Sequence, residues 1–208
     1  VLVMVVVVRE ERREGVGIVP LVSVVRAMAV PLLVVLDLDM CCWDPEMFQL
    51  SGPPSKWNPS DNSVTAGRDK IKMFPGAISA IRDIHSNPAF KHTQLAVASS
   101  TTEPDYARAC MRMFEIEKGV KMHDVVKYSE IFCSSKTNHF ANLKKSTKIA
   151  YDDMLFFDDC NWGNNCADVE RGCPGVITLA TPNGMQDREW KEGLAKFAKA
   201  KLARGAQN

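Results

Sequence analysis

Short apolar runs that end abruptly in acidic or hydroxyl side chains are the feature of this 208-residue chain that most constrains its fold. The runs PLLVVL, LAVA and MLFF are followed directly by Asp37, Ser99 and Asp158. Short continuous apolar runs of this kind are typical of strands buried on both faces, as in a parallel sheet. Because ligands bind at the carboxyl ends of such strands, we expect these polar side chains to meet at one crevice.

Segments with helical periodicity alternate with the apolar runs. The expected helices open at Pro75 and Pro104 or lie within residues 139–145 and 190–202. Further strands are expected near residues 127–132 and 175–179. This alternation predicts an α/β fold with a doubly wound, mainly parallel sheet and helices on both of its faces.

Two segments fall outside this alternation. Residues 41–72 are rich in Gly, Pro and Asn, which predicts loops or a small hairpin, and therefore a minimal cap domain or none. Residues 1–27 hold an apolar run followed by the charged stretch REERRE, the reverse of the order in a signal peptide. We expect residues 1–27 to be a leader outside the fold, with a targeting segment and a misassigned start codon as alternatives, and residues 28–208, which open at Met28, to form one domain.

The composition excludes several classes of partner. With a formal net charge of +1, the chain has no electrostatic basis for binding nucleic acid or an anionic membrane. Its seven cysteines are odd in number and form no CxxC pair, which indicates reduced thiols and a cytoplasmic location. We expect a monomer or weak dimer.

Two acidic pairs carry the chemistry. Asp37 and Asp39 follow one buried strand, and Asp158 and Asp159 follow another. At an effective dielectric of about 20, two carboxylates about 4 Å apart repel each other by roughly 4 kcal/mol. A hard divalent cation relieves this repulsion, and Mg²⁺ prefers a few carboxylates together with water and phosphate oxygens. Each pair alone is equally typical of a helix cap or turn, but two pairs at strand ends indicate a Mg²⁺ site.

The segments DLDMCCW, MFPG, ASSTTE, SKTNHF and FFDDCNWGN occur in this order along the chain. Over residues 31–199 the sequence resembles the magnesium-dependent phosphatase 1 family of the haloacid dehalogenase-like superfamily. The resemblance implies a Mg²⁺-dependent phosphomonoesterase that acts through an aspartyl-phosphate. Its substrate would be a phosphorylated small molecule, such as a sugar phosphate, or a phosphoprotein that carries phosphotyrosine.

The resemblance also implies residue roles. Asp37 would be the nucleophile and Asp39 the general acid and base. Ser99 and Lys136 would bind the phosphoryl group, and Ser100 would lie beside them against the substrate. The expected metal ligands are Asp37, the backbone carbonyl of Asp39, and Asp159, with Asp158 bound directly or beside them.

Two residues depart from the family pattern. Cys41 stands where a threonine is usual, and Ser100 stands where closer relatives carry an arginine that grips the phosphate. Arg68 or Lys70 on the insert is an alternative source of that positive charge. Other functional classes are a phosphate-binding module with weak catalysis and a dehalogenase, but the presence of Asp39 argues against the latter.

Four further side chains have two readings each. Asn161 could position Asp159 or belong to a turn, and His139 is expected to pack or cap rather than to bind metal. Trp43 and Trp57 could wall the pocket or cover the core.

Overall fold

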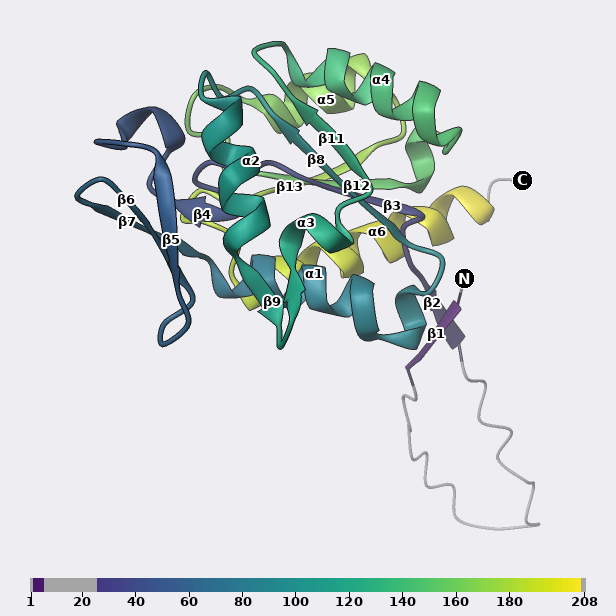
Figure 1. Cartoon of the computed structure of the whole chain (residues 1–208). Coiled ribbons are helices and arrows are strands. Elements are labelled where there is room, and N and C mark those ends of the chain that lie inside the picture. Colours follow the sequence, from purple (N-terminus) through teal and green to yellow (C-terminus); the bar gives the residue numbers. More distant parts are fainter. Residues whose placement is uncertain (1, 6–25, 207–208) are drawn as a thin grey trace, which may run out of the picture.

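The computed structural model describes residues 2–5 and 26–206. A five-stranded parallel sheet in the order β11-β8-β3-β12-β13 forms its centre (Figure 1). The strands are β3 (Leu33–Leu36), β8 (Gln94–Ser99), β11 (Tyr128–Ile131), β12 (Met154–Asp158) and β13 (Ile177–Ala180). The predicted parallel α/β fold is confirmed, and the strand before the first acidic pair is central.

Helices cover both faces of this sheet (Figure 1). One face carries α1 (Pro75–Ser86) and α6 (Asp187–Gly205), with α2 (Pro104–Met113) and the short α3 (Met122–Val125) beside them; the other carries α4 (Lys136–Thr147) and α5 (Asn165–Gly172). In β3, Val34 and Leu36 enter one hydrophobic cluster, whereas Leu33 and Val35 enter the other. This division explains why the strand is apolar at every position.

Two helices differ from the sequence prediction. α4 begins at Lys136, earlier than expected, so that this lysine lies in the first turn of the helix. α5 was not predicted, because its eight residues bury few apolar side chains. Asn164 caps α5 by accepting a hydrogen bond from the Ala167 backbone N–H, and this local contact defines where the helix begins.

The insert is more regular than predicted. It forms an antiparallel sheet in the order β4-β7-β6-β5, made of β4 (Trp43–Asp44), β5 (Pro54–Asn58), β6 (Ser63–Ala66) and β7 (Asp69–Met73). The expectation of loops with a small hairpin therefore underestimated the amount of β-structure in the insert. The polar composition hid Val64, Ala66 and Ile71, which enter the core from this sheet. The rest of the insert is the 3-10 helix η1 (Met47–Gln49) and connecting loops.

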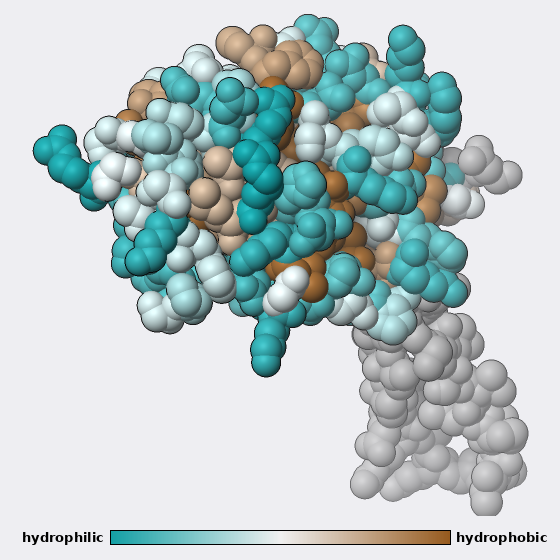
Figure 2. Space-filling model, in the orientation of Figure 1, coloured by the Kyte–Doolittle hydropathy of each residue, from teal (hydrophilic) through white to brown (hydrophobic). Residues whose placement is uncertain are grey.

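Smaller elements complete the described chain. β9 (Glu115–Glu117) pairs with β10 (Val120–Lys121), and 3-10 turns occur at η2 (Pro88–Phe90) and η3 (Tyr151–Asp153). Figure 2 shows that hydrophilic side chains cover most of one face of the molecule, with hydrophobic ones between them. No helix of the described part is long and apolar enough to cross a membrane.

The N-terminal region is described only in part. β1 (Leu2–Val5) pairs antiparallel with β2 (Arg26–Ala29). Most of the expected leader, namely residue 1 and residues 6–25, lies outside the described residues. The domain boundary near Met28 therefore stays a prediction.

Candidate active site

The expected site residues come from the carboxyl ends of three neighbouring strands and from the start of α4. The backbone N–H of Asp37 donates to the carbonyl of Phe157 at 2.9 Å, which ties the end of β3 to β12. As a result, Asp37 lies beside Asp158 and Asp159, which follow Phe157 directly. Ser99 ends β8 on the other side of β3.

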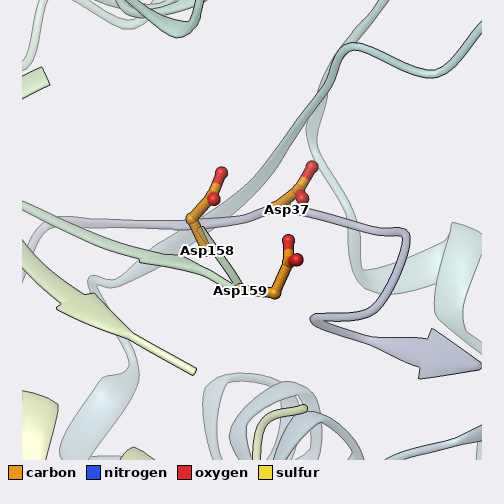
Figure 3. Close-up of side chains that lie close together, drawn as sticks. All are labelled: Asp37, Asp158 and Asp159. Carbon is orange, nitrogen blue, oxygen red and sulfur yellow. The ribbon is translucent and has the colours of Figure 1, made fainter. Parts of the chain in front are cut away.

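Three carboxylates form a cluster that is suited to a metal ion. One ligand atom from each of Asp37, Asp158 and Asp159 lies within 4.8 Å of the others (Figure 3). All three side chains are buried, so water screens their mutual repulsion poorly. A buried, all-oxygen group of this kind fits a hard divalent cation such as Mg²⁺.

Lys136 joins this cluster from the first turn of α4. Its Nζ donates to Asp37 Oδ1 at 2.5 Å and to the Ala98 carbonyl at 2.7 Å, and lies 3.2 Å from Asp158 Oδ2. Burial alone would lower the pKa of Lys136, but the carboxylates of Asp37 and Asp158 outweigh burial and raise it. The lysine is therefore a fixed positive charge beside Asp37.

The environment of Asp37 sets its protonation. Burial raises the pKa of Asp37 well above its usual range, and the ammonium group of Lys136 opposes this rise. The neighbouring carboxylates of Asp158 and Asp159 raise it further. A divalent cation at the cluster would favour the ionised form, which is the form that acts as a nucleophile.

Asp39 is held apart from the acidic cluster. Its Oδ1 accepts a hydrogen bond from Trp43 Nε1 at 2.8 Å, and its Oδ2 accepts one from the Met47 backbone N–H at 3.2 Å. Burial raises the pKa of Asp39, and the two hydrogen bonds oppose this rise. A carboxyl with a raised pKa is suited to give and take protons near neutral pH.

Backbone and amide donors orient the second acidic pair. Asp158 Oδ1 accepts from the Cys160 N–H at 2.9 Å and from Asn165 Nδ2 at 3.0 Å. Asp159 Oδ2 accepts from the Asn161 backbone N–H at 3.0 Å. Burial raises the pKa of Asp159, and the Asn161 N–H opposes the rise. Asn161 thus contacts Asp159 through its backbone, whereas Asn165, which the sequence did not single out, contacts Asp158 through its side chain.

The two serines at the end of β8 differ in their contacts. Ser99 is buried, and its Oγ accepts from the Thr101 backbone N–H at 3.3 Å. The hydroxyl of Ser100 donates to the Ser134 carbonyl at 2.7 Å, so its one proton is already used. Lys70 pairs with Asp61 instead of facing the site, and neither Lys70 nor Arg68 is among the described residues that line the cavity.

A cavity of about 330 Å³ brings most of the predicted residues together. Its lining includes Asp37, Asp39, Ser99, Ser100, Lys136 and Asp159. It also includes side chains that sequence reasoning missed, namely Glu46, Phe48, Thr101, Thr102, Trp162 and Asn165. Glu46 and Phe48 come from the segment around η1 and Trp162 from the loop after β12, and only the tertiary fold brings these segments to one cavity. The one signal available was that both segments adjoin acidic motifs.

The structure also shows the positions of Trp43, Trp57, His139 and Cys41. Trp43 is buried and touches Asp39, whereas Trp57 bonds to Asn62 outside the cavity. His139 is buried; its Nε2 lies 3.0 Å from the Phe132 carbonyl, and burial lowers its pKa to about 4. Cys41 is buried and accepts a hydrogen bond from the Thr181 hydroxyl at 3.4 Å.

A parallel sheet with an aspartate directly after β3, another at the end of β12 and a buried lysine on α4 is the arrangement of a haloacid dehalogenase-like hydrolase. The chain belongs to the acid phosphatase family, whose sequence pattern matches residues 29–200. This match covers the whole sheet and every residue of the site.

Individual relatives agree with this family. The chain is 29% identical over 171 residues to human "Magnesium-dependent phosphatase 1", a match that covers 82% of this chain and 89% of the human protein. It is 27% identical over 138 residues to "HAD-like hydrolase superfamily protein P8B7.31" of Schizosaccharomyces pombe, covering 65% and 79% of the two chains.

A solved structure shares the fold. It is the N-terminal part of the protein BF1531 from Bacteroides fragilis, described as containing a phosphatase domain complexed with Mg. The TM-score is 0.54 at 15% identity, and the match covers 81% of this chain and 40% of that one.

Proposed function

We propose that this protein is a Mg²⁺-dependent phosphomonoesterase that works through a phosphoryl group carried on Asp37. The observation that carries the proposal is the placement of Asp37 Oδ1, 2.5 Å from Lys136 Nζ and within a buried cluster of three carboxylates. The human relative named as a magnesium-dependent phosphatase supports both the metal and the reaction.

Asp37, Asp159 and the backbone carbonyl of Asp39 would hold the metal, with Asp158 beside them. When bound, Mg²⁺ would neutralise the carboxylates and stabilise charge on the phosphoryl oxygens. The donors that surround Asp158 suit it to orienting Lys136 and the cluster, because both of its oxygens already accept hydrogen bonds.

The residues then divide the reaction into two steps. The carboxylate of Asp37 attacks phosphorus, the bond to the leaving oxygen breaks, and Asp39 gives that oxygen its proton. In the second step Asp39 takes a proton from water, which attacks the phosphoryl group and frees Asp37. Lys136 stabilises negative charge on the phosphoryl oxygens throughout, and Ser99 donates a hydrogen bond to one of them.

The open cavity is compatible with more than one substrate. The lining side chains Phe48 and Trp162 are largely exposed to solvent, so the cavity is open, and both protein phosphotyrosine and sugar phosphates are candidate substrates. Among the described residues that line the cavity, Lys136 is the one basic side chain, which favours a substrate with a single phosphate group.

A hydrolysis screen tests the proposal. Phosphotyrosine peptides, sugar phosphates and an artificial aryl phosphate would be incubated with the protein, with Mg²⁺ and with a chelator. We expect phosphate release that requires Mg²⁺ and is lost in Asp37→Asn. Release that is unaffected by the chelator would argue against the proposed function.

A further inference from the structure

Two solvent-exposed aromatic rings lie at the catalytic cavity. Phe48 on η1 and Trp162 on the loop between β12 and α5 both line it, with 53% and 77% of their surfaces exposed. The ring centroids are 6.3 Å apart and the ring planes meet at 68°, an edge-to-face contact. Two distant segments thus present a joined aromatic surface beside the reacting groups, where a ligand can cover it.

Glu46 fixes one of these rings and brings a negative charge. Trp162 Nε1 donates to Glu46 Oε1 at 2.7 Å, and Glu46 is only 8% exposed. Among the described residues, no lysine, arginine or histidine forms an ion pair with Glu46. Within the described part of the chain, no basic side chain therefore balances this carboxylate.

The charges that line the cavity favour a positive group on the substrate. In the proposed reaction Mg²⁺ would neutralise Asp37 and Asp159, and Asp39 would carry a proton, which leaves Glu46 as the uncompensated carboxylate among the described residues of the lining. Lys136 is already engaged with Asp37 and Asp158. A bound phosphate adds further negative charge, so a cation on the leaving side of the ester would gain electrostatic energy.

We propose that Phe48, Trp162 and Glu46 form a leaving-group subsite that binds an ammonium group of the substrate. This inference rests on the proposed function and names the ester: a phosphorylated amino alcohol, with its phosphate at Asp37 and its cation at the aromatic pair. Aromatic faces attract cations, and the adjacent carboxylate adds to this attraction. An uncharged aromatic leaving group would use the rings but not Glu46, and a sugar could contact both but brings no positive charge to balance the carboxylate.

A pair of isosteric esters separates charge from shape. Choline phosphate carries a quaternary ammonium group, and its dimethylbutyl analogue has an uncharged carbon in place of the nitrogen. We expect the parent protein to hydrolyse choline phosphate with a kcat/KM about fivefold to thirtyfold higher than that of the neutral ester. An aryl phosphate measures the basal reaction independently.

Three variants assign the preference to the subsite. Trp162→Leu keeps an apolar side chain without a π-face, and Glu46→Gln removes the charge but keeps an oxygen that Trp162 Nε1 can donate to. Each should lower the ratio of the two kcat/KM values to within about twofold of unity. Phe48→Leu should lower it partly. Phe132→Leu is the matched control, because Phe132 is 39% exposed outside the cavity lining, and it should leave the ratio unchanged.

The outcomes separate this inference from the proposed function. Equal or faster hydrolysis of the neutral ester, or a preference that survives in both Trp162→Leu and Glu46→Gln, would overturn the ammonium subsite. The same holds if the aryl phosphate is hydrolysed and neither alkyl ester is. If none of the esters is hydrolysed, the proposed function is contradicted, and the subsite is then tested separately by calorimetry. The two alkyl esters would be titrated into Asp37→Asn, and we expect choline phosphate to bind more tightly than the neutral ester.

Discussion

The indole of Trp43 is the contact that distinguishes Asp39 from the other acidic side chains of the site. Trp43 is fully buried, and its Nε1 donates to Asp39 Oδ1 at 2.8 Å. This hydrogen bond lowers the pKa of Asp39 against the larger effect of burial, which raises it. Trp43 therefore influences both where the carboxyl group of Asp39 lies and the pH at which it titrates.

Replacing Trp43 by Phe should remove the hydrogen bond to Asp39 while largely filling the same space. We expect kcat to fall by about tenfold with little change in KM. Because the lost hydrogen bond stabilised ionised Asp39, the pKa of Asp39 rises in the variant, and the alkaline limb of the kcat profile moves to higher pH. Steady-state kinetics across pH measure both effects.

Trp57→Phe is the matched control, since Trp57 donates to Asn62 away from the cavity. It should leave the kcat profile in place. An alkaline limb that stays fixed in Trp43→Phe would contradict the role given to this hydrogen bond.

The family resemblance leads us to expect an arginine at the position of Ser100, and the structure offers no replacement among the described residues that line the cavity. Serine to arginine at this position would add a planar fork of donors for two phosphate oxygens. We expect Ser100→Arg to lower KM by about tenfold with little change in kcat, because the added binding is common to ground and transition states. Kinetics on one aryl phosphate at saturating Mg²⁺ test this.

The same substitution removes the hydrogen bond from Ser100 to the Ser134 carbonyl. Ser100→Ala isolates that loss and should leave KM near the parent value. An unimproved KM in Ser100→Arg, beside an unchanged Ser100→Ala, would show that phosphate capture does not limit the parent enzyme.

At the scale of elements, the acidic loop after β12 is expected to cost stability when no metal is bound. The raised pKa of Asp159 means that its contribution favours the folded state at low pH and is lost as pH rises through its folded pKa. Above that pH, the ionised side chain faces the buried carboxylates of Asp37 and Asp158.

At a pH above neutrality, Asp159→Asn should therefore raise the melting temperature of the metal-free protein by about 2–4 °C. It should also lose most of the stabilisation that Mg²⁺ gives the parent. Thermal melts with Mg²⁺ and with a chelator measure both changes. Asp105→Asn, on an exposed acid of α2, is the control and should change neither.

A metal-free melting temperature that falls in Asp159→Asn would indicate that this carboxylate stabilises the fold by itself. A full response to Mg²⁺ in the same variant would remove Asp159 from the metal site.

The sequence predicted best those elements whose burial on both faces requires a continuous run of apolar residues. β3, β8 and β12 read as continuous apolar runs because both of their faces are covered, and their ends therefore identified Asp37, Ser99 and Asp158. The insert sheet and α5 were missed because polar and turn-forming residues dominate them. Glu46 and Trp162 were missed because their meeting at 2.7 Å depends on two loops whose relative position only the assembled fold fixes.

At the scale of the whole molecule, the boundary of the domain can be tested directly. The central sheet begins at Leu33, and the sequence pattern of the acid phosphatase family begins to match at residue 29. We expect a protein that starts at Met28 to fold and to keep full Mg²⁺-dependent activity, although it lacks β1 and half of β2.

Circular dichroism, melting temperature and hydrolysis rates of this shortened protein, compared with those of the full chain, give the test. Insolubility or inactivity of the shortened protein beside a healthy full chain would show that the strand pair at the N-terminus supports the fold.

The central claim is that Asp37 carries the phosphoryl group, and trapping that group tests it most directly. Protein quenched in acid during turnover of an aryl phosphate would be digested and examined by mass spectrometry. We predict a phosphorylated peptide that contains Asp37, formed only with Mg²⁺, and neither phosphorylation nor turnover in a folded Asp37→Asn. Phosphate on another residue, or hydrolysis by Asp37→Asn within about tenfold of the parent, would contradict the account.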